Sequence, residues 1–165
     1  KQCRKTYKMS NISTAYDEIR DLLIATLPNH KEIINPYLPE LNDDITTEKS
    51  FGLAFGEGLN TELQLACRMS IDRSMRVILT RKIFGGNLMR STDGSKVRRD
   101  AEKNLFEDQY LIIKALEESP TITDSGAITK CVYQSDNGLE FVRIDRIDLI
   151  MLTSTFTLTY FEELN

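Results

Sequence analysis

The chain has 165 residues, of which 41% are hydrophobic and 28% are charged. This length and balance are those of one globular domain that buries a core without metal or disulfide staples. The formal net charge of −4 disfavours wrapping around nucleic acid, because such binding depends on neutralising phosphates, but it leaves room for a local basic patch.

The cysteines Cys3, Cys67 and Cys131 are far apart and form no CxxC pair, so the sequence predicts neither a zinc site nor a disulfide framework. We expect free thiols in a reducing cytoplasm, with Cys67 and Cys131 inside strands. No apolar run approaches the roughly 20 residues that span a bilayer. No apolar signal core follows the basic first residues.

The N-terminal part of the chain reads as an arm, a helix and a long connection. We expect residues 1–11 to be a flexible basic arm ahead of a single domain, residues 12–165. A helix is predicted over 14–27, with Ser13 or Thr14 as its N-cap. Asp17 in its first turn suits the helix dipole. The apolar stripe of this helix comprises Tyr16, Ile19, Leu22, Leu23 and Leu27.

A connection with three prolines follows over residues 28–49. Its length favours a contact loop, since long connections in compact domains are usually functional or mobile. The only histidine, His30, lies in it. No Cys or carboxylate pattern surrounds His30, so we interpret it as a structural or solvated side chain.

Residues 50–84 alternate apolar and polar side chains and are predicted to form two strands. Gly52, Gly56 and Gly58 interleave with the apolar positions of the first strand and favour a bend or bulge. The alternation slips again at Asp72-Arg73-Ser74. We expect the two strands to protrude as a hairpin flanked by polar residues.

A second helix is predicted from about 97 to 118, after a loop that contains Gly85 and Gly86. Basic side chains lie near its start, where they oppose the helix dipole: Lys96, Arg98 and Arg99. They indicate either a solvated basic turn, over 85–99, or a contact. The apolar stripe of the helix comprises Ala101, Leu105, Phe106, Ile112, Ile113 and Leu116.

Two strands and a turn are predicted over residues 126–148. Asp136-Asn137-Gly138 is typical of a type I′ hairpin turn, because Asn-Gly supplies positive φ angles. Charged and apolar residues alternate from Arg143 to Asp148, which suggests an exposed edge or a strip of ion pairs between subunits.

The last strand has the clearest pattern in the chain. From Leu152 onward it alternates with a period of two and contains no Gly or Pro, which predicts an interior strand of an antiparallel sheet. Its inward set is predicted to be Leu152, Ser154, Phe156, Leu158 and Tyr160. The sequence therefore predicts an α+β fold: a mainly antiparallel β-sheet with two helices packed on one face, plus a protruding β-hairpin.

The motifs of the common enzyme classes are missing from the sequence. It has no GxSxG, HExxH or P-loop, and its single histidine makes Ser/His or Cys/His catalysis hard to build. We therefore expect no catalytic, cofactor-binding or metal site, with a two-metal nuclease of scattered carboxylates as the enzymatic alternative.

The order of elements, ending in Ser154-Thr-Phe-Thr-Leu-Thr-Tyr-Phe-Glu-Glu163, resembles the tail terminator proteins of long-tailed phages, the family of the lambda minor tail protein U. In that family the final strand ends in alternating aliphatic and Thr residues followed by Tyr and Glu, which here are Leu158-Thr-Tyr160 and Glu162. The strand around Glu62-Leu63-Gln-Leu65-Ala looks like the family's central strand.

The resemblance implies a structural virion protein of the tail or neck, assembled in the host cytoplasm. It implies a homohexameric ring that caps the tail tube protein, stops tube polymerisation and meets the head-side connector or stopper protein. DNA would pass through the channel without specific binding, and no membrane would be involved. A ring requires one patch to meet a different patch on its neighbour.

Charged side chains on the predicted hairpin, the basic turn and the Arg143–Asp148 strip are the candidate subunit or partner contacts. They are Arg68, Asp72, Arg73, Arg76, Arg90, Lys96, Arg98, Arg99, Arg143 and Asp145. The alternatives are another head–tail joining protein, for tail completion or head closure, and a nucleic-acid-binding module that uses Lys96, Arg98, Arg99 and the N-terminal arm.

Overall fold

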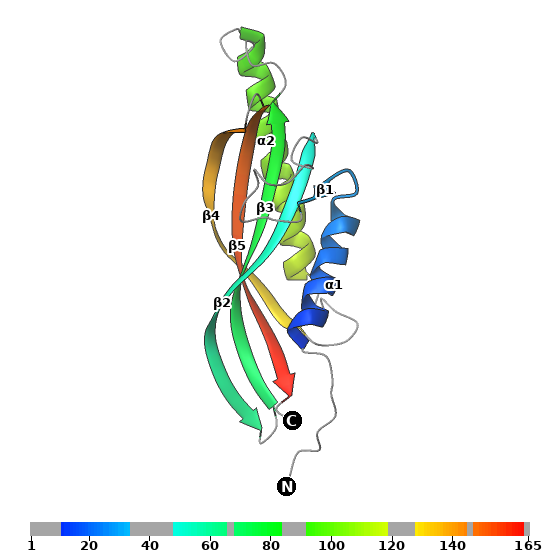
Figure 1. The fold of residues 1–165 in the computed structure, drawn as a ribbon, viewed down its shortest axis with the longest axis vertical. Coiled ribbons are helices and arrows are strands. Elements are labelled where there is room, and N and C mark those ends of the chain that lie inside the picture. The colour runs from blue at the N-terminus through cyan, green and yellow to red at the C-terminus, as the bar shows by residue number, and fades with distance from the viewer. Residues whose placement is uncertain are drawn as a thin grey trace.

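The computed structural model of the protein describes residues 11–33, 48–65, 68–83, 92–118, 128–144 and 147–163. Within these residues the elements are α1 (Asn11–Thr26), β1 (Lys31–Glu32), β2 (Lys49–Leu65), β3 (Arg68–Ile83), α2 (Thr92–Glu118), β4 (Ile128–Ile144) and β5 (Ile147–Glu163). The strands form one sheet in the order β1-β2-β3-β5-β4. Every strand pair is antiparallel except β1–β2. Both helices pack on one side of the sheet, which confirms the predicted α+β fold (Figure 1).

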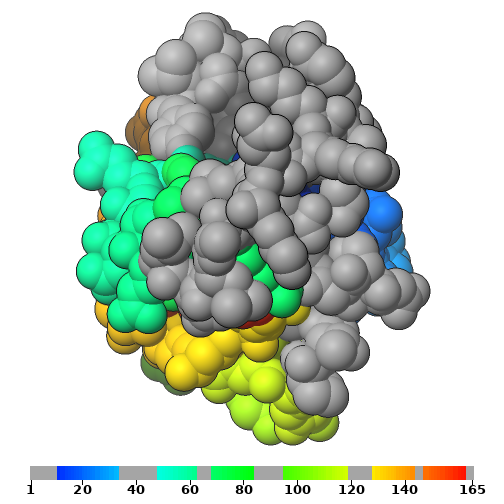
Figure 2. Space-filling view, turned by 90° about the horizontal axis from the view of Figure 1, so that it is seen from below, coloured from blue at the N-terminus to red at the C-terminus, as the bar shows by residue number. Residues whose placement is uncertain are grey.

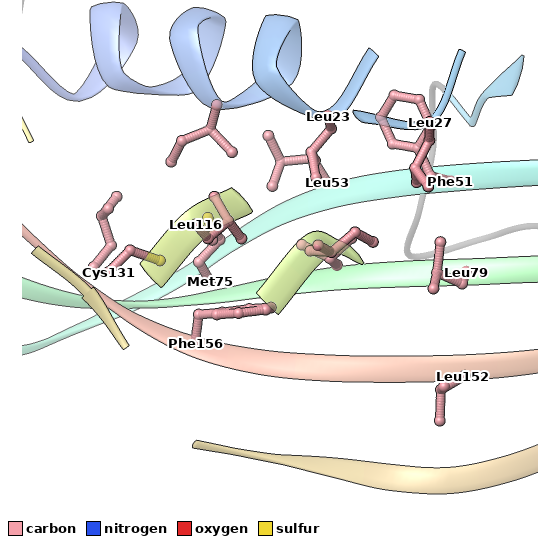
Figure 3. Close-up of a cluster of buried hydrophobic side chains, with 14 of the residues drawn as sticks. Leu23, Leu27, Phe51, Leu53, Met75, Leu79, Leu116, Cys131, Leu152 and Phe156 are labelled. Atoms are coloured by element: carbon pink, nitrogen blue, oxygen red, sulfur yellow. The ribbon is translucent and has the colours of Figure 1, made fainter. Parts of the chain in front are cut away.

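The core lies between the two helices and one face of the sheet. β5 contributes the predicted inward set, all of it buried. β3 lies beside β5 in antiparallel register, with Leu79 opposite Leu152 and Met75 opposite Phe156. Figure 3 shows Leu23 of α1 close to the side chains that the sheet directs into this core. The period of two along β5 therefore places its apolar side chains against the helices, as predicted.

From Thr153 to Thr159 the other face of β5 carries threonine instead of large apolar side chains. Thr153, Thr155, Thr157 and Thr159 are all half-buried. Their neighbours on β3 are polar over most of the same length: Thr155 lies opposite Arg76, Thr157 opposite Ser74 and Thr159 opposite Asp72. Over this stretch the sheet thus has one apolar face and one largely polar face, as is common in antiparallel sheets. Further along the same face, Ile78, Leu149 and Met151 are buried.

The first helix begins earlier than predicted and is capped from the far end of the chain. α1 starts at Asn11, which places Asp17 in its second turn. The backbone N–H groups of Asn11 and Ile12 donate to the carboxylate of Glu162, at 3.3 and 3.2 Å. The Asn11 side-chain amide also donates to the carbonyl of Phe161. Ser13 and Thr14 were therefore wrong as N-caps, because a carboxylate on β5 satisfies the free amides and the helix dipole.

The predicted Asn-Gly hairpin turn is wrong. β4 runs without a break from Ile128 to Ile144, and Asp136-Asn137-Gly138 is a register shift within it. Gly138 has φ 72°, and its N–H donates to Asp136 Oδ1 at 2.8 Å. The positive φ therefore makes a bulge. The β4–β5 hairpin closes further on, where Ile144 pairs with Ile147.

The irregularity predicted near Asp72-Arg73-Ser74 lies in the partner strand. β3 is continuous there, whereas β2 shifts register between Phe55 and Gly58 and again before Asn60. A Cβ on Gly56 would lie 3.3 Å from the Cβ of Ser74, so this position favours glycine. The bulge predicted from the β2 glycines is thus confirmed.

The β2–β3 pair does not stand alone. β5 pairs with β3 from Ile83 to Arg68, so three strands extend together and a protruding hairpin is not confirmed. Seen from below, β2 and the start of β4 both reach the surface, and the C-terminal end of α2 lies beside the start of β4 (Figure 2). None of the helices in the described residues is long and apolar enough to cross a membrane.

Candidate interaction surfaces

Three of the predicted contact residues lie on the polar face of β3. Arg68, Asp72 and Arg76 are four positions apart, so the strand period places them on the same face. Asp72 Oδ1 accepts a hydrogen bond of 2.7 Å from the Thr159 hydroxyl. The guanidinium of Arg68 stacks 3.8 Å above the ring of Phe161. The result is a charged strip that alternates in sign along the open face of the sheet.

Arg73 belongs to the opposite face and is used inside the molecule. Its Nη1 donates to the carbonyl of Gly56 at 2.7 Å, and its Nε donates to the hydroxyl of Tyr160 at 3.3 Å. The Gly56 carbonyl belongs to the bulged part of β2, where the regular ladder is interrupted. We assign Arg73 to the fold, because its donors stabilise the bulge and the end of β5.

The other predicted basic residues lie at the opposite end of the sheet. Lys96, Arg98 and Arg99 are exposed on the first turns of α2, which extend past the strands (Figure 1). The helix begins at Thr92, earlier than the predicted start near residue 97, so Lys96 also lies within it. Arg98 Nε donates to Glu102 at 2.8 Å, and its guanidinium lies 3.9 Å above the ring of Phe141 on β4. Arg98 therefore ties the helix start to the edge strand, and Lys96 and Arg99 form the outer basic surface.

Arg143 is paired within its own chain. It meets Asp148 through two hydrogen bonds, Nε to Oδ1 at 2.5 Å and Nη2 to Oδ2 at 2.8 Å. The hydrogen bond from Arg143 holds the pKa of Asp148 below its usual value. This pair links β4 to β5 beside the hairpin connection. Arg90 and Asp145, two further candidates, lie outside the described residues.

A buried cluster of charged and polar side chains joins three distant segments. Asp108 of α2 accepts from Arg81 Nη2 of β3 at 2.5 Å, and His30 Nε2 lies 3.1 Å from the same oxygen. The His30 side chain is only 4% exposed. Burial raises the pKa of Asp108, but the hydrogen bonds from His30 and Arg81 outweigh it and hold that pKa below its ordinary value.

This cluster has part of the geometry of a catalytic triad, in which a carboxylate orients a histidine. The other ring nitrogen of His30, Nδ1, is buried and has no hydrogen-bond partner. A nucleophile would have to be hydrogen-bonded there. Among the described residues none is. The contacts of Asp108 with Arg81 and His30 fix α2 against β3.

A second polar network lies beside the bulge in β4. Gln109 Nε2 donates to Ser154 Oγ at 2.9 Å and to Asp136 Oδ2 at 3.1 Å. The Tyr133 hydroxyl donates to the same Asp136 oxygen at 2.7 Å. These hydrogen bonds, Tyr133 first, lower the pKa of Asp136. The network holds the bulge against α2, which explains why an Asp-Asn-Gly sequence is used there without a turn.

Sequence reasoning missed the outward face of α2. Phe106 was predicted to lie in the buried stripe, but it is 46% exposed. Tyr110 and Leu111 are 64% and 45% exposed on the same side of the helix. With Lys103 and Glu107 they line a shallow groove of about 560 Å³. Phe106 and Tyr110 are four residues apart, about one helical turn, and this spacing in the sequence indicates that they share one side of the helix.

Comparison with models of known protein families gave no match, and comparison with curated proteins gave none either. Within the described parts of the chain, no three His, Cys, Asp or Glu side chains are grouped so as to hold a metal ion. The thiol of Cys131 is buried, and burial raises its pKa to about 12, so it is a poor nucleophile.

Proposed function

We propose that the protein is a structural virion protein that forms a hexameric ring, caps the tail tube and joins the tail to the head-side connector. Its resemblance to phage tail terminators supports this role. So does the order of its elements, in which a helix precedes a pair of long strands and a second helix precedes another pair.

The observation that carries the proposal is that the sheet ends in two unlike edges. β1 covers β2 only at Ser50 and Phe51, so the stretch Glu57–Glu62 is an exposed edge. On the other side, β4 has β5 as its only strand neighbour within the described residues. When one edge of a copy meets the other edge of the next, the contact is heterologous and closes into a ring if the rotation allows.

A charge introduced on the β2 edge tests the proposal. Leu59 is 54% exposed and lies in the bulged stretch, without a register partner on β3. Leu59→Lys should leave the fold intact but place a charge on the edge, a device that prevents strand pairing. Ile24→Lys on α1 is the matched control, because Ile24 is 41% exposed and belongs to a helix, not to either strand edge.

Light scattering and electron microscopy should show wild-type rings with a central hole, formed alone or on the ends of purified tail tubes. Leu59→Lys should abolish them and Ile24→Lys should retain them. A wild-type protein that stays monomeric and ignores tube ends would contradict the proposal. Particles made without the gene separate the two joining roles: tails of abnormal length indicate a terminator, and headless normal tails or leaking heads indicate another joining protein.

A further inference from the structure

The outward face of α2 combines exposed apolar side chains with an ordered set of charges. Phe106, Tyr110 and Leu111 are each between 45% and 64% exposed. Clusters of large apolar side chains at a surface, rimmed by charge, are typical of contact sites. The buried side of the same helix is formed by Leu105, Ile112 and Leu116, so the exposed group is not needed for the core.

Two ion pairs flank these apolar side chains along the helix. Lys103 and Glu107 are 3.7 Å apart, and Lys114 and Glu118 are 4.0 Å apart. All four side chains are at least half exposed. At about 100° per residue, the charged side chains lie on the same outward face as Tyr110.

This charge pattern is complementary to itself when reversed. Lys103 and Glu118 lie at equal distances from the midpoint between Tyr110 and Leu111, and so do Glu107 and Lys114. In an antiparallel pair of α2 helices centred on that midpoint, Lys103 faces Glu118 and Glu107 faces Lys114. A parallel pair in register would place each charge against its like.

We propose that α2 is a self-association surface, on which a second copy of this chain docks its own α2 antiparallel about a two-fold axis between Tyr110 and Leu111. The two aromatic-aliphatic pairs form the centre of the contact, and four ion pairs form its rim. Such a contact is isologous and closes at two copies. It leaves both sheet edges open and does not depend on the ring.

Charge reversal distinguishes this contact from any other. In a homodimer of the Glu107→Lys variant, the introduced lysine would face the partner's Lys114, and in a homodimer of Lys114→Glu, the introduced glutamate would face the partner's Glu107. Each variant alone should self-associate at least about tenfold more weakly than wild type, because like charges oppose across the contact. In a mixture of the two variants, a heterodimer would place lysine against glutamate at both of these rim positions, so mixing should restore association that neither variant shows alone.

The double variant Glu107→Lys/Lys114→Glu tests the same contact with a single chain. It exchanges the two charges within one chain, so across the antiparallel contact each introduced charge meets an opposite one. The double variant should therefore recover self-association to near the wild-type level, although each single reversal weakens it. A contact with any other registry or direction has no reason to restore association in this way.

The measurement is sedimentation velocity over a concentration series, with circular dichroism to verify that each variant is folded. Wild type should show a concentration-dependent dimer, Tyr110→Ser should remove it and Ile24→Ser should not. A wild type that is monomeric at every concentration, or a double variant that associates no better than either single reversal, would overturn the proposal. The ring and the α2 dimer are tested separately. Leu59→Lys changes only the sheet edge, so this variant should lose the ring and still dimerise through α2.

Discussion

Each face of α2 carries side chains that are more usual on the other. The inward face buries Asp108 and Gln109 beside Leu105, whereas the outward face exposes Phe106 and Tyr110. Each buried polar side chain has partners on the sheet: Asp108 bonds to β3, and Gln109 bonds to β4 and β5. Buried polar side chains thus fix the helix against the sheet, and large apolar side chains are exposed on its outward face.

This contrast separates stability from association. Substitutions on the inward face should change the free energy of unfolding, since they leave cavities or unpaired polar groups. Substitutions on the outward face should change assembly and leave folding nearly unaffected. Leu105 and Phe106 are adjacent in sequence, as are Gln109 and Tyr110, and in each pair the first is buried and the second exposed. Neighbouring variants are therefore natural controls for each other.

The largest effect is expected from Asp108→Ala. Arg81 would then be buried at 8% exposure without its carboxylate, and loss of one partner of a buried ion pair destabilises by about 3–5 kcal/mol. Urea unfolding measures the change. The double variant Arg81→Met/Asp108→Leu is the control and should lose less than Asp108→Ala, because it removes both charges. An equal or greater loss would show that the ion pair does not hold α2 in place.

The same carboxylate predicts the pH dependence of stability. The folded-state pKa of Asp108 is depressed, so the native protein holds the ionised form more strongly than the unfolded chain does. This contribution is present above the unfolded pKa of about 3.9 and disappears as pH falls through the lower folded value. The stability difference between wild type and Asp108→Ala should therefore be constant near neutral pH and shrink below about pH 4.

Leu105 and Phe106 are adjacent apolar residues with opposite expected outcomes. Leu105 is fully buried, and Leu105→Ala should lower the free energy of unfolding by roughly 2–5 kcal/mol through the cavity that it leaves. Phe106→Ala should change it by less than about 0.5 kcal/mol, as is usual at exposed positions. Thermal or urea unfolding of both variants checks this. Similar losses for both would mean that the outward face is also part of the core.

The sequence predicted the parts of the fold that depend on local periodicity. The period of two along β5 correctly identified Leu152, Phe156 and Tyr160 as buried, because strand geometry alone decides which side chains share a face. The stripe of α1 was likewise correct at Ile19 and Leu23. These features need only the neighbouring residues.

Features that depend on distant residues were not predictable. The cap of α1 comes from Glu162, which is 151 positions from Asn11. Asp136-Asn137-Gly138 has the local chemistry of a turn, but β5 continues beside it and pairing along β4 converts it into a bulge.

The candidate contact surface was only partly predictable for the same reason. Charge in the sequence identified Arg68, Asp72 and Arg76, and the strand period places them together. Charge alone did not reveal that Arg73 and Arg143 already have partners within the chain. Periodicity of apolar residues also failed on α2, where it assigned Phe106 to the core and omitted Asp108.

The smallest contrast in stability between neighbours is expected at Gln109 and Tyr110, where the polar residue should matter more than the aromatic one. Gln109→Ala removes the amide that binds Ser154 and Asp136, and a buried hydroxyl left without its partner costs about 1–3 kcal/mol. Tyr110→Ser should change the free energy of unfolding by less than about 0.5 kcal/mol when measured at concentrations where the protein is monomeric.

At high concentration, where α2 pairs form, Tyr110→Ser should lower the melting temperature relative to wild type, because association with the folded state adds stability by mass action. A melting temperature of wild type that does not rise with concentration, or a loss for Tyr110→Ser in the monomer as large as that for Gln109→Ala, would remove the distinction between the two faces of the helix.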